Sequence, residues 1–93
     1  MDADRHVEAD SRVSTILVID DDPIARKLLE TIIVSQGYPR PECLDDSRQI
    51  AKRMTHQRYS VVLLDLNMPH VGGQESLKML SSDYPDIPVI VIT

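Results

Sequence analysis

Several residue types are scarce in this 93-residue chain, and each scarcity excludes a kind of core, cross-link or binding motif. There is no Phe, no Trp and only three Tyr, so the core must be mainly aliphatic. The single cysteine, Cys43, cannot form a disulfide within the chain, and we expect it to be a small buried residue. With three glycines, the sequence has neither a G-x-G-x-x-G turn nor a Walker-type loop, which argues against nucleotide binding.

Positive charge is also in short supply. Ten Lys and Arg stand against fifteen Asp and Glu, and the basic residues are scattered. Because binding to phosphate backbones needs clustered cations, we expect no direct nucleic-acid binding by this segment. No run approaches the ~20 apolar residues of a membrane span, and residues 1–13 lack the apolar centre of a signal peptide. We therefore expect a cytoplasmic protein with no membrane association.

The apolar residues gather in short runs that are typical of strands. Residues 15–19, 60–64 and 89–92 are nearly continuous in Val, Ile and Leu, which predicts strands buried in a parallel sheet. A weaker strand is predicted over residues 38–44, and its two prolines place it at an edge of the sheet.

Helical patterns separate these strands. Asp22 and Pro23 are a typical N-cap and first helical residue, and the first helix ends near Gly37. A second helix is capped by Asp46 or Ser47, and a third follows residue 73. Since parallel strands need crossover connections, the alternation predicts an α/β fold with a doubly wound parallel sheet and helices on both faces.

Polar residues follow three of the predicted strands. Asp20 and Asp21 end the first, Asp65 ends the third, and Thr93 ends the fourth. Crowded carboxylates repel unless a cation is present, and Mg²⁺ prefers oxygen ligands of this kind. The run of three acids after the first strand is equally well explained as a cap and turn, but two strands that both break into Asp are harder to explain in this way.

Three motifs in register resemble the successive signatures of bacterial two-component response-regulator receiver domains. They are ILVIDDDP at residues 16–23, VVLLDLNMP at residues 61–69 followed by Gly73, and IPVIVIT at residues 87–93. The resemblance implies the flavodoxin-like fold, in which ligands bind beyond the carboxyl ends of the strands.

The resemblance also implies roles for individual residues. Asp65 would accept a phosphoryl group from a sensor histidine kinase or phosphotransfer protein, with no turnover of an external substrate. Asp21 would bind Mg²⁺ directly and Asp20 would assist through water, while Asp65 and the backbone carbonyl of Asn67 would complete the protein ligands. The Thr93 hydroxyl would hydrogen-bond to the phosphoryl group and so sense it.

The family fold has five strand–helix units, whereas this sequence matches it only to the end of the fourth strand. We expect residues 1–13 to be a flexible tail and residues 14–93 to be a partial receiver with strands 1–4 and helices 1–3, without the last helix–strand–helix. An output domain would then lie beyond residue 93. Residues 89–92 would form an exposed apolar edge, so we expect the chain to self-associate.

Two alternatives belong to other functional classes. The chain could be a receiver-like interaction module that is not phosphorylated. It could also be a haloacid-dehalogenase-like phosphatase, since Asp20-x-Asp22 resembles the D-x-D signature of that family, although Pro23 leaves no loop after the motif.

Overall fold

The computed structural model describes residues 15–67 and 72–92. The expected tail and Thr93 lie outside these residues, so neither expectation is addressed by the fold. In chain order the elements are β1 (Ile16–Ile19), α2 (Pro23–Ser35), β2 (Glu42–Leu44), the 3₁₀ turn η1 (Ser47–Gln49), α3 (Ile50–His56), β3 (Val61–Leu64), α4 (Gly73–Asp83) and β4 (Val89–Val91). None of the helices in this part of the chain is long and apolar enough to cross a membrane.

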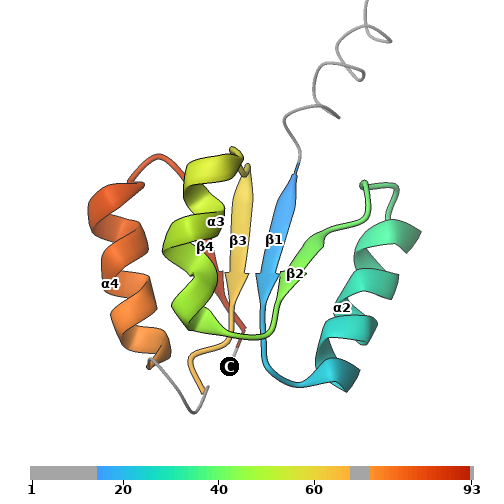
Figure 1. Cartoon of the computed structure of the whole chain (residues 1–93). Coiled ribbons are helices and arrows are strands. Elements are labelled where there is room, and N and C mark those ends of the chain that lie inside the picture. Colours follow the sequence, from blue (N-terminus) through green and yellow to red (C-terminus); the bar gives the residue numbers. More distant parts are fainter. Residues whose placement is uncertain (1–14, 68–71, 93) are drawn as a thin grey trace, which may run out of the picture.

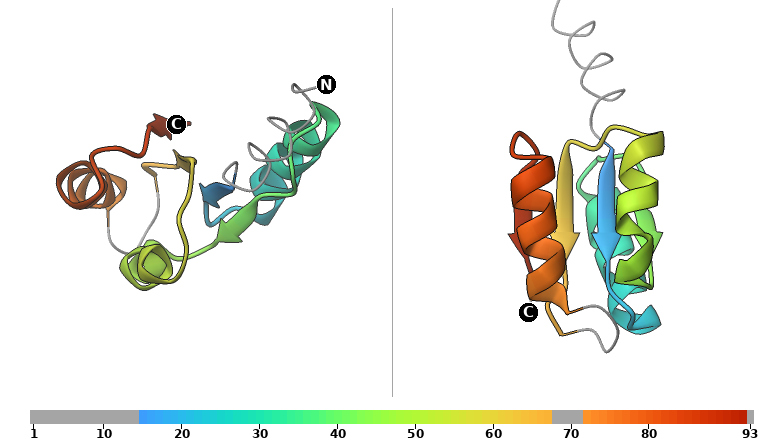
Figure 2. Two further views of the ribbon diagram at one scale, coloured as in Figure 1. Left: turned by 90° about the horizontal axis from the view of Figure 1, so that it is seen from above. Right: turned by 60° about the vertical axis from the view of Figure 1, so that its left-hand side comes forward.

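The four strands form one parallel sheet in the order β2-β1-β3-β4 (Figure 1). The predicted doubly wound α/β fold is therefore confirmed, with β2 at an edge as its prolines indicated. All four strands point the same way, so the loops that follow β1 and β3 meet at one end of the sheet (Figure 1). Seen along the strands, α3 and α4 lie on one face of the sheet and α2 on the other (Figure 2).

The first helix begins where the sequence predicts. The Asp22 carboxylate accepts a hydrogen bond of 2.9 Å from the backbone N–H of Ile24, and Pro23 follows as the first helical residue. The helix ends at Ser35, and Gly37 then adopts a positive φ of 94°, which a residue with a Cβ would adopt only under strain. In the next connection Asp46, rather than Ser47, caps η1 by accepting from the N–H of Arg48 at 2.9 Å.

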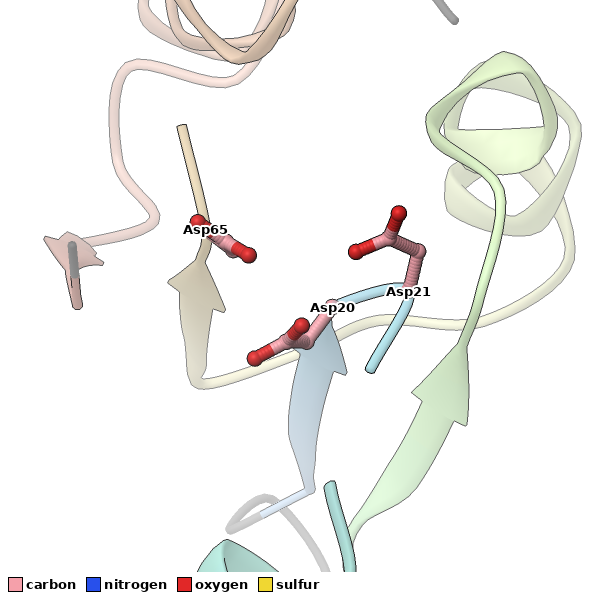
Figure 3. Close-up of side chains that lie close together, drawn as sticks. All are labelled: Asp20, Asp21 and Asp65. Carbon is pink, nitrogen blue, oxygen red and sulfur yellow. The ribbon is translucent and has the colours of Figure 1, made fainter. Parts of the chain in front are cut away.

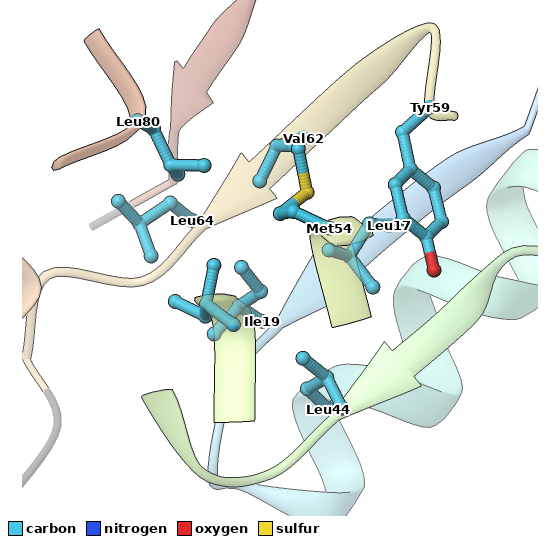
Figure 4. Packing of buried hydrophobic residues seen from close by; sticks show 9 residues of the cluster. Leu17, Ile19, Leu44, Met54, Tyr59, Val62, Leu64 and Leu80 are labelled. Atoms are coloured by element: carbon cyan, nitrogen blue, oxygen red, sulfur yellow. The ribbon is translucent and has the colours of Figure 1, made fainter. Parts of the chain in front are cut away.

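The main core lies between the sheet and the helices α3 and α4 (Figure 4). Its members are aliphatic apart from one tyrosine: Leu17, Ile19, Leu44, Ile50, Met54, Tyr59, Val62, Leu64 and Leu80. Burying each large side chain contributes about 1.5–3 kcal/mol, so this cluster contributes more than the smaller one on the other face. On the α2 face, Ile16, Val18 and Ile33 form a smaller cluster.

Three expectations need correction or refinement. The second strand covers Glu42–Leu44 rather than residues 38–44, because Pro39 and Pro41 have no N–H to donate to a neighbouring strand. Cys43 is only partly buried, since the edge strand leaves one side open. Finally, the strand expected over residues 89–92 covers Val89–Val91; in the described part of the chain it pairs only with β3, and Ile90 is 51% exposed.

Candidate functional site

The ends of β1 and β3 are aligned by the pairing of the two strands. Their last paired residues are Ile19 and Leu64, and the N–H of Asp65 then donates to the carbonyl of Ile19 at 2.9 Å. On the other side of β1, the N–H of Asp20 donates to Leu44 of β2 at 3.0 Å. The first residues beyond the two strands are therefore neighbours across the sheet, and both are aspartates.

Three carboxylates meet at the end of the sheet where β1 and β3 finish (Figure 3). Asp20, Asp21 and Asp65 each offer one carboxylate oxygen, and these atoms all lie within 4.8 Å of one another. Asp20 and Asp65 are 3% and 6% exposed, whereas Asp21 remains accessible to solvent. A ligand would therefore enter from the Asp21 side and meet two buried carboxylates behind it.

The crowding alters the acidity of one member of the cluster. Burial raises the pKa of the Asp20 carboxyl above its usual value, and the neighbouring charges of Asp65 and Asp21 raise it further. A hydrogen bond from the backbone N–H of Asp22 acts in the opposite direction. Negative charge at this position is thus held at a free-energy cost that a bound cation would offset.

Backbone N–H groups orient the two buried carboxylates. Asp20 Oδ1 accepts from the N–H of Asp22 at 2.9 Å, and Asp65 Oδ1 accepts from the N–H of Asn67 at 2.8 Å. Each aspartate thus turns its side chain onto the chain two residues ahead. This local contact fixes one oxygen of each buried carboxylate.

The structure brings together three of the five predicted site residues, Asp20, Asp21 and Asp65. Asn67 is exposed, and its N–H contacts the site by donating to Asp65 Oδ1. The role of its carbonyl as a metal ligand stays a prediction. Thr93 lies outside the described residues. Sequence reasoning missed Arg26, whose Nη1 donates to the backbone carbonyl of Asp20 at 2.8 Å. The available signal was its position in the first turn of α2, because helical side chains tilt toward the helix N-terminus.

The donor set suits a hard divalent cation. Carboxylate oxygens are the ligands that Mg²⁺ prefers, and Mg²⁺ keeps several waters in addition to one or two carboxylates. One accessible carboxylate beside two buried ones leaves such waters room on the solvent side. The repulsion among the three groups gives the site a physical reason to bind a cation.

Comparison with known proteins places this arrangement in a family. Residues 16–93 match the model of the response regulator receiver domain. The probable transcriptional regulatory protein TcrX of Mycobacterium tuberculosis is 33% identical over 85 residues, which are 91% of this chain and 36% of TcrX. The chain spans only part of such relatives, for example 12% of the sensor kinase/phosphatase CqsS of Vibrio cholerae and 37% of the response regulator GacA of Pseudomonas aeruginosa.

Solved structures agree. The response regulator TrrA of Thermotoga maritima, in complex with Mg²⁺–BeF, is 28% identical with a TM-score of 0.78, over 84% of this chain and 67% of that one. TrrA in complex with the histidine kinase ThkA aligns with a TM-score of 0.79 at 29% identity, over 86% and 68% of the two chains. Fold, site and sequence agree: the chain belongs to the response regulator receiver domain family of two-component signalling.

Proposed function

We propose that this chain accepts a phosphoryl group on Asp65 from a histidine kinase or a phosphotransfer protein. The observation that carries the proposal is the pairing of β1 with β3, which sets Asp65 beside Asp20 and Asp21 at one end of the sheet. Asp65 is the acceptor because it is the aspartate that directly follows β3, and the N–H of Asn67 in its own loop holds its carboxylate in place.

The reaction is a transfer between two nucleophiles. An oxygen of the Asp65 carboxylate attacks phosphorus, the P–N bond to the histidine of the donor breaks, and an acyl phosphate forms. The N–H of Asn67 donates to Oδ1 and so fixes the plane of the carboxylate before the attack. The protein's contribution is to position this group and to neutralise charge; no external substrate is turned over.

The cation of this reaction would be Mg²⁺, held by Asp20, Asp21, Asp65 and the backbone carbonyl of Asn67. When bound, Mg²⁺ supplies charge neutralisation for the carboxylates and the incoming phosphoryl oxygens. Asp21 would bind the ion directly, and its being the accessible member of the cluster supports this role. The buried Asp20 would assist from behind, through water, and its burial behind the accessible Asp21 supports this role.

The remaining parts of the signalling pathway extend this proposal. The Thr93 hydroxyl would sense the bound phosphoryl group and start the conformational change. The change would pass to an output domain or a partner protein, as the names of transcriptional regulators among the relatives suggest. A phosphodonor kinase that uses ATP would place this exchange in the cytoplasm.

The two alternatives make different predictions. For a phosphatase of the D-x-D type, Asp22 should reach the reaction centre, but its carboxylate caps α2 by accepting from Ile24. An interaction module that is never phosphorylated has no need to bury Asp20 and Asp65 side by side at a cost in repulsion. Neither alternative gains support from a further contact in the described residues.

The test is incubation with acetyl phosphate, with and without Mg²⁺, followed by intact-mass spectrometry. The expected result is one added phosphoryl group per chain that appears only with Mg²⁺. An unmodified mass under all conditions would support the interaction module. Continuous hydrolysis of a phosphate monoester such as p-nitrophenyl phosphate would instead support the phosphatase.

A further inference from the structure

Arg26 touches the candidate site although it belongs to α2. It lies in the first turn of the helix, where its own N–H donates to the carbonyl of the Asp22 N-cap at 3.0 Å. Its half-buried side chain reaches back past this turn, and Nη1 donates to the carbonyl of Asp20 at 2.8 Å. The contact thus joins the start of α2 to the end of β1.

The acceptor carbonyl occupies a particular point of the chain. The preceding carbonyl, that of Ile19, accepts from the N–H of Asp65, which follows β3, and the N–H of Asp20 donates to the carbonyl of Leu44 in β2. The carbonyl of Asp20 is the first one beyond β1, and it accepts from the Arg26 guanidinium. It belongs to the peptide that joins Asp20 to Asp21, so its direction sets where the Asp21 side chain starts.

We infer that Arg26 is a positioning residue of the cation and phosphoryl-acceptor site. By holding the carbonyl of Asp20, the guanidinium fixes the peptide between Asp20 and Asp21, so that both carboxylates face Asp65. A hydrogen bond from a charged donor is roughly twice as strong as a neutral one, which suits it to hold a turn against the repulsion of three acids. The inference rests on the proposed function.

Three variants test the inference. Arg26→Gln removes the charge and shortens the side chain, while Arg26→Lys keeps the charge and one donor on a flexible stem. Lys27→Gln is the matched control, because Lys27 is the next residue of α2, is exposed, and pairs with Glu30 at 3.6 Å. For each folded variant, calorimetric titration gives the Mg²⁺ dissociation constant, and intact mass gives the rate of phosphorylation by acetyl phosphate.

We expect the Mg²⁺ dissociation constant to be about tenfold higher in Arg26→Gln, about threefold higher in Arg26→Lys and unchanged in Lys27→Gln. Phosphorylation should be slowest in Arg26→Gln, intermediate in Arg26→Lys and unchanged in Lys27→Gln. A merely structural role would lower the melting temperature and leave the dissociation constant of the folded protein unchanged, which would overturn the inference. Equal weakening in Lys27→Gln would also overturn it, since it would reveal a general charge effect.

Two further outcomes keep this inference separate from the proposal on which it rests. If Arg26→Gln does not fold, Arg26→Lys decides: a threefold weaker constant supports the inference and a wild-type constant overturns it. If the wild-type protein itself neither binds Mg²⁺ nor gains a phosphoryl group, the proposed function fails and the inference falls with it. An active wild type with an equally active Arg26→Gln overturns the inference alone.

Discussion

The backbone N–H of Asp65 donates a hydrogen bond of 2.9 Å to the carbonyl of Ile19. This bond continues the pairing of β3 with β1 by one residue. It makes Asp20 and Asp65, the first residues after the two strands, neighbours of each other. Asp20 and Asp65 therefore approach each other because of the sheet itself. The strand register therefore keeps the two residues adjacent and brings their like charges together.

The first prediction concerns the free energy that this repulsion costs. The pKa of Asp20 is raised in the folded state, so its charge lowers stability at every pH above its unfolded pKa. Asp20→Asn should stabilise the Mg²⁺-free protein on the order of 1–3 kcal/mol in urea unfolding at pH 7, because one like charge is removed. Asn can still accept from the N–H of Asp22.

Adding Mg²⁺ should make the wild-type protein more stable than Asp20→Asn, the reverse of the order expected without Mg²⁺. Wild-type protein should gain melting temperature as Mg²⁺ is added, whereas Asp20→Asn should gain much less because it has lost one carboxylate of the cluster. Asp22→Asn is the control, since Asp22 caps α2 and Asn is an equally good cap. Equal responses to Mg²⁺ in all three proteins would contradict the site.

A second prediction tests the loop that follows Asp65. A Cβ built on Gly73 would lie 2.2 Å from Cα of Leu66, so Gly73→Ala cannot be accommodated without moving the backbone. We expect a loss of more than about 2 kcal/mol in urea unfolding, although helix propensity alone would favour Ala at this first residue of α4. At Gly72 the nearest such atom is Glu75 Oε1 at 3.9 Å, so Gly72→Ala should cost less than about 1 kcal/mol. Similar costs at both positions would be inconsistent with the close approach of Leu66.

A third prediction concerns alkaline pH. Burial, together with a hydrogen bond of 2.7 Å from the Tyr59 hydroxyl to Glu42, raises the pKa of Tyr59 to about 12. A raised pKa stabilises the fold below the unfolded value near 10, and this stabilisation is lost as pH rises from about 10 to 12. The loss should be roughly 2–3 kcal/mol.

Other groups also titrate in this range, so the comparison with Tyr59→Phe isolates the effect. The unfolding free energy of Tyr59→Phe should fall less steeply between pH 10 and pH 12, as followed by circular dichroism in urea. Parallel curves for the two proteins would show that the Tyr59 hydroxyl ionises normally. Arg53 also donates to Glu42, at 2.9 Å, and this bond remains in the variant.

A fourth prediction concerns self-association. In the described part of the chain β4 pairs with a strand on one side only, and Ile90 and Val91 are 51% and 41% exposed. An apolar edge of this kind favours pairing with another chain, so sedimentation velocity should show oligomers that grow with concentration. Ile90→Lys should reduce them, whereas Ser82→Lys, at an exposed position of α4, should not. A monomer at every concentration would refute this prediction.

The part of the fold that could be predicted from sequence is the part in which local pattern and burial agree. The apolar runs of β1 and β3 are needed on both faces of the sheet, so the same residues that define the strands also place Asp20 and Asp65 at their ends. The N-cap at Asp22 was equally predictable, because it depends on two adjacent residues.

What could not be predicted depends on contacts between elements. The apolar pattern of α2 does not reveal that Ile33 is buried while Ile24 and Leu28 are 78% and 59% exposed, since this depends on where the helix lies against the sheet. The position of Arg26 in the first turn of α2 indicates only that its side chain tilts toward the start of the helix. Its bond to the carbonyl of Asp20 depends in addition on the angle at which α2 leaves β1, which no residue spacing encodes.

The central claim is that Asp65 is the residue that carries the phosphoryl group, and mapping the modified residue tests it most directly. After incubation with acetyl phosphate and Mg²⁺, borohydride reduction converts an acyl phosphate into an alcohol that peptide mass spectrometry can locate. We predict that the label appears at Asp65, is absent from Asp65→Asn and is retained in Asp22→Asn. A label at Asp20 or Asp21, or one that persists in Asp65→Asn, would contradict the account.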